Sequence, residues 1–257
     1  MQEYPYQEWN PTDLFNQIIA EIIVIIMLAI ISATLWQKYA ERRTSEVKSL
    51  CIGISSMTIA FLVALIPKFY ALYDHEDPWI NGIPIFYQDY RLWWTNFSYV
   101  FIMITNLALM HFIYLVFKKP SSNVRYLFLG LNIIFNVWSV YHGIFVVVPG
   151  IASLTLPMSI IFIIISFYLW FTLFWYAIDL YKRVDPSVFR QGILIIALSA
   201  FCSILAFIMY TFYSLLKLFF LGRLYFMFII FTCFLLYLGY VLPPWFRKIL
   251  EKTNRTK

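Results

Sequence analysis

The chain alternates long apolar runs with short polar segments. Runs such as IIVIIMLAIISA at residues 22–33 are continuously apolar and lack the alternating pattern of strands in a membrane barrel. A helix that crosses a bilayer needs about 20 predominantly apolar residues. The pattern therefore predicts an all-α polytopic membrane protein, a seven-transmembrane helix bundle with spans at 14–36, 49–72, 93–117, 125–148, 154–180, 188–214 and 223–242.

The composition agrees with a lipid environment. The chain is 62% hydrophobic and 12% charged, whereas a soluble domain averages about 45–50% apolar and about 25% charged residues. Aromatic residues make up 21% of the chain, which suits the aromatic belts at the two membrane interfaces. Five tryptophans fall near predicted helix ends, namely Trp36, Trp93, Trp94, Trp175 and Trp245.

The charges of the connecting segments predict the orientation. Fifteen of the nineteen Lys and Arg residues lie in 37–48, 118–125, 181–190 and 243–257. Cytoplasmic loops carry such an excess of cations. We expect a multi-pass protein of the cell membrane, with an extracellular segment at 1–13, a transmembrane domain at 14–242 and a basic cytoplasmic juxtamembrane tail at 243–257. The acidic N-terminus lacks a basic signal-peptide region, so the first helix is expected to be a retained anchor.

Several polar side chains interrupt the predicted spans. Such residues are costly in hydrocarbon and usually face the bundle interior or a water-filled cavity. With alternating helix directions, five of them fall in the outer half of the bundle, which predicts an outward-opening polar crevice that binds a ligand. These candidate ligand-binding residues are Glu21, Lys68, Asn96, His142 and Lys217.

Each of these residues also has a structural interpretation. Asparagines often join helices by hydrogen bonds worth about 0.6 kcal/mol each. Lysines near helix ends extend their ammonium groups to the interface. For Glu21, with Gln17 one turn away on the same helix face, a functional and a structural role remain equally open.

The sequence carries no recognisable set of catalytic or metal-binding residues. The three cysteines lie in separate apolar runs, and the three histidines lack the spacing of metal ligands. No nucleophile motif or phosphate-binding loop is present. We therefore expect no enzyme activity, no metal and no cofactor. The net charge of +6 belongs to the cytoplasmic loops, so nucleic acid is not an expected partner.

The last span ends in YVLPPWFRK at residues 240–248. Proline cannot continue the hydrogen-bond ladder of a helix, so Pro243 and Pro244 are expected to stop or kink it. Trp245 and Arg247 then fall at the membrane interface, where cations contact anionic lipid head groups. These four residues form either a simple anchor or a signalling junction that docks a partner.

The segment LYLGYVLPPWFRK at 236–248 resembles the exit from the seven-helix sensory modules at the N-terminus of some prokaryotic histidine kinases. The resemblance implies a membrane sensor whose input site lies among the helices. The kinase part has no counterpart here: no dimerisation helix, phospho-accepting histidine region or ATP-binding domain follows Lys248. Kinase activity is therefore not expected of this chain.

Three functions remain open. The leading one is a sensor or receptor-like protein that passes a small-molecule, lipid or physical cue to a separate cytoplasmic signalling protein, in signal transduction at the plasma membrane. The second is a small-solute or proton-coupled transporter that uses Glu21. The third is a non-catalytic membrane assembly subunit. The expected partners are thus the lipid bilayer, a ligand and a cytoplasmic protein.

Overall fold

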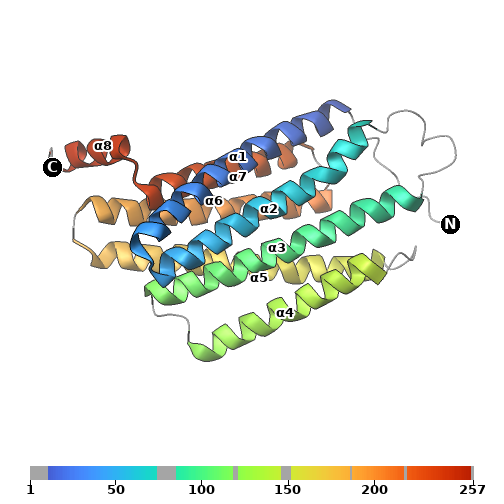
Figure 1. Ribbon diagram of the computed structural model, residues 1–257, viewed down its shortest axis with the longest axis horizontal. Coiled ribbons are helices and arrows are strands. Elements are labelled where there is room, and N and C mark those ends of the chain that lie inside the picture. Colours follow the sequence, from blue (N-terminus) through green and yellow to red (C-terminus); the bar gives the residue numbers. More distant parts are fainter. Residues whose placement is uncertain are drawn as a thin grey trace.

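The computed structural model describes residues 11–73, 85–117, 121–145, 152–185, 187–216 and 219–255. Within these ranges all regular structure is helical, which confirms the all-α prediction (Figure 1). The elements are α1 Pro11–Arg42, α2 Ser45–Tyr73, α3 Ile85–Phe117, α4 Ser122–Phe145, α5 Ala152–Arg183, α6 Val188–Leu216, α7 Phe219–Leu236, the π-helical turn η1 Tyr237–Val241 and α8 Pro244–Arg255.

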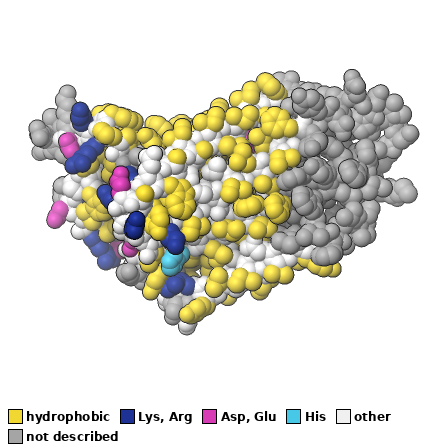
Figure 2. All heavy atoms as spheres, in the orientation of Figure 1, with side chains coloured by type: hydrophobic (Ala, Val, Ile, Leu, Met, Phe, Trp, Pro, Cys, Tyr) yellow, Lys and Arg dark blue, Asp and Glu magenta, His cyan; other side chains and the backbone are white. Residues whose placement is uncertain are grey.

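Within the described residues, six helices are long and apolar enough to cross a membrane. They are the spans Phe15–Arg42, Ser45–Ile66, Phe97–Phe117, Ile161–Arg183, Val188–Phe212 and Phe220–Tyr240. On the face that Figure 2 shows, hydrophobic side chains spread over the middle of the described part, and Lys and Arg gather toward the end where α8 lies. The chain is therefore a multi-pass membrane protein. Helix α4, the fourth predicted span, is not among the six.

The helices run roughly parallel along one long axis (Figure 1). Each of α1 to α4 packs on the next one, α5 and α6 pack together, and α7 packs against both α6 and α1. Helix α4 packs mainly on α3 and lies at the edge of the bundle. The end where α1 begins is called the N-terminal end below, and the end that carries α8 is called the C-terminal end.

The apolar core runs between these helices in the middle of the bundle. Its largest fully buried side chains include Leu28 and Ile31 of α1, Ile54 of α2, Ile113 of α3 and Leu169 of α5. Large aliphatic groups at one-turn spacing fill the space between neighbouring helices, because van der Waals packing replaces the hydrophobic effect inside a bilayer.

Hydroxyl groups add short polar links between neighbouring helices. Ser32 on α1 lies 2.7 Å from Ser55 on α2, oxygen to oxygen, and the indole of Trp36 donates to the same Ser55 oxygen at 3.0 Å. Between another pair of helices, the hydroxyl oxygens of Ser203 on α6 and Thr232 on α7 are 3.3 Å apart. These contacts are interhelical hydrogen bonds of the kind expected in membrane bundles.

The hydrogen-bond pattern of the last transmembrane helix changes before the two prolines. Helix α7 gives way to the π-helical turn at Tyr237, and Leu242 then adopts a left-handed conformation with φ of 46°. A new helix, α8, begins at Pro244, because proline lacks only an N–H that the first helical position leaves unbonded anyway. The two prolines predicted the interruption, whereas the helix in the tail was not predicted from the sequence.

Two close contacts hold this turn against the bundle. The ammonium group of Lys38 on α1 donates to the carbonyl oxygen of Tyr240 at 2.9 Å. On the other side, Gly239 approaches the backbone of α6 so closely that a Cβ there would lie 2.9 Å from Cγ1 of Ile196 and 3.3 Å from the oxygen of Gly192. The turn is therefore clamped between α1 and α6.

Candidate ligand cavity

A cavity of about 320 Å³ lies inside the bundle, in its half toward the N-terminal end. Six helices, α1, α2, α3, α5, α6 and α7, contribute lining residues. The wall mixes apolar and aromatic groups with the polar residues Gln17, Glu21, Lys68, Ser98, Tyr99, Thr105, Asn106, Ser203, Tyr210 and Tyr225. Its size and mixed lining match those of small-molecule sites in proteins.

Glu21 and Lys68, which both line this cavity, form an ion pair. The ammonium group of Lys68 on α2 donates to Oε1 of Glu21 on α1. Glu21 is only 4% exposed, and its second oxygen, Oε2, is buried with no hydrogen-bond partner among the described residues. The Lys68 nitrogen also lies 5.8 Å from the ring centre of Phe226 on α7. One carboxylate oxygen thus remains available to a polar group in the cavity.

The structure brings together two of the five predicted ligand-binding residues, Glu21 and Lys68. The side chain of Asn96 lies outside the described residues, although its backbone belongs to α3. The same holds for His142 in α4, and no described residue of α4 lines the cavity. Lys217 lies entirely outside the described residues.

Asn106 lines the cavity and also joins two helices. Its amide nitrogen on α3 donates to the hydroxyl of Ser166 on α5 at 3.1 Å, and both residues are buried. Thr105, one position earlier, donates to the carbonyl oxygen of Gly53 on α2 at 3.0 Å. These bonds fix α3 between α2 and α5, so they set the shape of the cavity floor.

Tyrosines form a further part of the cavity wall, which was not predicted from the sequence. The ring centres of Tyr210 on α6 and Tyr225 on α7 are 5.3 Å apart, and Tyr99 on α3 packs on Phe162 of α5 at 5.0 Å. Phenol rings offer an apolar face and one hydroxyl that donates and accepts hydrogen bonds. With 19 tyrosines in the chain, the sequence gives no signal to single these out.

The predicted signalling-junction residues lie at the C-terminal end, away from the cavity. Pro243 is buried, and its carbonyl oxygen accepts hydrogen bonds from the amides of Phe246 and Arg247 at 2.9 and 3.0 Å. Pro244 opens α8, Trp245 is 52% exposed, and the Arg247 guanidinium pairs with Glu251 at 2.9 Å. The junction thus begins a short amphipathic helix rather than an extended tail.

Helices α1 and α7 connect the two regions. Gln17 and Glu21 line the cavity near the start of α1, and Lys38 near its end binds the π-helical turn. Tyr225 and Phe226 line the cavity from α7, which runs directly into that turn. Glu21 and Lys38 are 17 residues apart, or about 26 Å along a helix. Both helices therefore contribute to the cavity at one end and to the junction at the other.

Among the described residues, no three His, Cys, Asp or Glu side chains lie close enough together to hold a metal ion. Comparisons of the chain with models of known protein families, with curated proteins and with solved structures found no match.

Proposed function

We propose that this chain is a seven-helix membrane sensor, or receptor, whose ligand site is the cavity around Glu21 and Lys68. Occupancy of the cavity shifts α7 against α1 and changes the junction formed by η1 and α8. A separate cytoplasmic protein reads that change. The mechanism is a population shift, which requires a ligand that binds the two packings with different affinity.

The observation that carries this proposal is the ion pair at the cavity wall, in which Glu21 is buried and Lys68 is half-buried. A buried salt bridge contributes little net stability, because desolvation of both charges offsets their attraction. Ionisable residues inside a membrane are rare and usually functional. Glu21 also keeps one buried oxygen without a partner among the described residues, so it offers a hydrogen-bond acceptor to a ligand.

The route from the cavity to the junction supports a sensor. The carbonyl oxygen of Tyr240 is held by Lys38, and the turn that contains it is π-helical. Single π-helical turns inside helices occur frequently at functional sites. Such a turn can regain α-helical geometry when α7 shifts, which gives the junction two discrete arrangements.

The proposal includes a seventh span at α4, an outer N-terminal end and a cytoplasmic C-terminal end. Helix α4 has 24 residues, or about 36 Å of helix, which exceeds the roughly 30 Å hydrocarbon thickness. Its surface is apolar at Leu127, Ile133, Ile134 and Val137, all of them exposed on the bundle. The cation-rich segments between the helices favour this orientation.

The test is a thermal-stability screen of the purified protein in nanodiscs against a library of small polar and amphiphilic molecules. A ligand at 100 times its Kd stabilises the folded state by about 2.7 kcal/mol. The proposal expects a stabilising compound whose effect disappears in the Glu21→Gln/Lys68→Met double variant but persists in Asn132→Leu on α4. Stabilisation that survives in the double variant would contradict it.

A transporter is the second candidate, because a buried carboxylate with one oxygen that lacks a partner among the described residues also suits a proton or cation site. Uptake of the stabilising compound into proteoliposomes separates the two functions. A sensor gives no uptake above empty liposomes. Uptake that Glu21→Gln abolishes would favour the transporter instead.

A further inference from the structure

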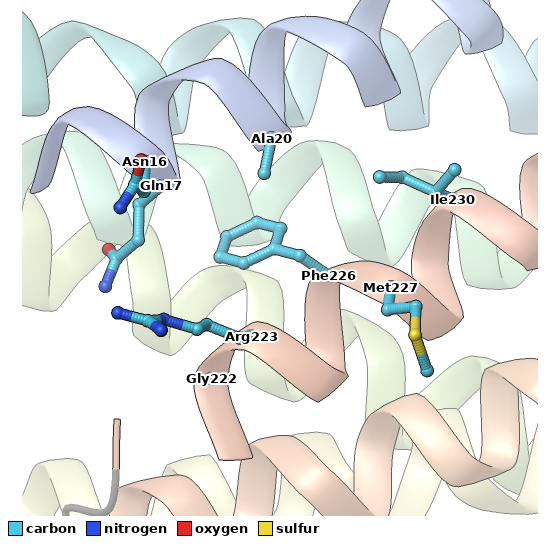
Figure 3. A pocket seen from close by; sticks show the side chains of 8 residues that line it. All are labelled: Asn16, Gln17, Ala20, Gly222, Arg223, Phe226, Met227 and Ile230. Carbon is cyan, nitrogen blue, oxygen red and sulfur yellow. The ribbon is translucent and has the colours of Figure 1, made fainter. Parts of the chain in front are cut away.

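A second cavity, of about 250 Å³, forms a groove between α1 and α7 on the surface of the bundle (Figure 3). It opens outward, since Asn16, Arg223 and Met227 along it are exposed. Both helices belong to spans that can cross a membrane, Phe15–Arg42 and Phe220–Tyr240. The groove therefore faces the lipid rather than the centre of the bundle.

One end of the groove is polar and positively charged. Asn16 and Gln17 lie in the second turn of α1, and Arg223 lies in the second turn of α7. The side chains of Gln17 and Arg223 point toward each other across the groove (Figure 3). Arg223 is the only charged group among the described lining residues. This end thus offers a guanidinium and two carboxamides close to the ends of both spans, where lipid head groups are expected.

The remainder of the groove is apolar. From the polar end it passes Ala20 on α1 and then Phe226, Met227 and Ile230 on α7 (Figure 3). Gly222 and Ile230 are eight residues apart, which corresponds to about 12 Å along the helix axis. The small side chain of Ala20 leaves the space between the two helices open. An extended hydrocarbon chain fits a furrow of this kind.

We propose that this groove binds an anionic phospholipid of the surrounding leaflet. The phosphate lies against Arg223, with Asn16 and Gln17 as additional hydrogen-bond donors, and one acyl chain follows the furrow past Ala20 to Ile230. A guanidinium recognises phosphate oxygens by paired hydrogen bonds and by charge. The site is separate from the ligand cavity and does not rest on the sensor proposal.

The two cavities nevertheless share a wall. Gln17, Gly222 and Phe226 line both, and the Phe226 ring stands between the groove and Lys68. A lipid seated in the groove therefore packs against one face of that ring. This contact places the lipid on α1 and α7, the two helices that connect the cavity with the junction.

The test compares lipid binding by native mass spectrometry of the whole chain with phosphatidylglycerol and phosphatidylcholine of identical acyl chains. Loss of one cation near the head group weakens anionic-lipid binding about fivefold. The site predicts that Arg223→Gln lowers the affinity for phosphatidylglycerol by about this factor and leaves that for phosphatidylcholine unchanged. Arg183→Gln, which removes an exposed guanidinium at the other end of the bundle, is the matched control.

A second pair of variants tests the furrow independently of charge. Ala20→Leu fills the groove and should release both lipids, while Ala29→Leu, at an exposed position on the same helix, should bind like wild type. The proposal is overturned if Arg223→Gln and Arg183→Gln behave alike, or if Ala20→Leu retains phosphatidylglycerol as well as Ala29→Leu does. Equal affinity of the wild-type chain for the two lipids also overturns it.

Discussion

Lys68 on α2 donates a hydrogen bond to one oxygen of Glu21 on α1, while the other oxygen is buried without a partner among the described residues. A carboxylate in this state is stabilised by its counter-ion and still accepts a hydrogen bond from a ligand. Glu21 and Lys68 therefore affect both the stability of the bundle and the proposed binding of a ligand, and variants of the two residues can separate these effects.

Breaking the ion pair from one side should cost more than removing it altogether. Glu21→Gln and Lys68→Met each leave a charge or polar group without its partner, and we expect each to lower the free energy of unfolding by about 3 kcal/mol. The double variant should regain most of this loss, because no buried charge remains. Unfolding in mixed detergent, followed by circular dichroism, gives the three values. Equal losses that simply add would show that the two residues are not coupled.

Two buried asparagines should respond in opposite ways to the same change. Asn106→Leu removes the bond to Ser166 and leaves its hydroxyl unpaired, so we expect a loss of about 1–3 kcal/mol in unfolding free energy. Asn132 donates only to a carbonyl of its own helix, at Phe128, and its amide oxygen has no partner among the described residues. Asn132→Leu should therefore be neutral or stabilising.

The same unfolding assay checks both asparagine variants. A destabilisation by Asn132→Leu as large as that by Asn106→Leu would mean that its amide oxygen binds a group on α4 or its neighbours that the described residues do not include.

Because η1 lies so close to α6, replacing Gly239 even with alanine should destabilise the protein. In Gly239→Ala the new Cβ would lie 2.9 Å from Cγ1 of Ile196 and 3.2 Å from its backbone nitrogen. Overpacking of this kind costs about 1–3 kcal/mol. The control is Gly130→Ala on α4, where no atom lies within 4 Å, and alanine favours a helix by up to about 1 kcal/mol. Melting temperatures in nanodiscs should fall for the first variant and hold or rise for the second.

Removal of the Lys38 ammonium group should loosen the π-helical turn. Lys38→Met deletes the donor to the Tyr240 carbonyl, so amides of residues 237–241 should exchange with deuterium faster than in wild type. Lys48→Met, an exposed lysine on α2, is the matched control and should leave this segment unchanged. Unaltered exchange in Lys38→Met would show that the turn is held by other contacts.

The sequence predicted the long helices because continuous apolar runs leave the backbone no alternative in lipid, and among the described residues six of the seven predicted spans are long and apolar enough to cross a membrane. It placed their ends less well. Helix α3 begins at Ile85 rather than at 93, and α5 continues to Arg183 rather than to 180, because helical hydrogen bonds persist beyond the apolar window. Helix α8 was missed, although Trp245, Phe246, Ile249 and Leu250 follow an amphipathic helical spacing.

Glu21 and Lys68 were predictable because charges inside apolar runs are rare. Their pairing followed only from the position of α2 against α1, which hydropathy does not encode. The tyrosines of the cavity wall gave no signal, since Tyr210 and Tyr225 look like any other aromatic residues of the spans. The position of α4 at the edge of the bundle could not be predicted either, because a pattern of apolar runs does not distinguish a central helix from a peripheral one.

Hydrogen–deuterium exchange of the wild-type chain and the Glu21→Gln/Lys68→Met variant in nanodiscs would show whether the cavity controls the junction. We expect altered exchange at residues 237–250, about 26 Å along α1 from the substitutions, and no change there in Asn132→Leu. Altered exchange confined to residues around 21 and 68, with 237–250 as in wild type, would contradict it.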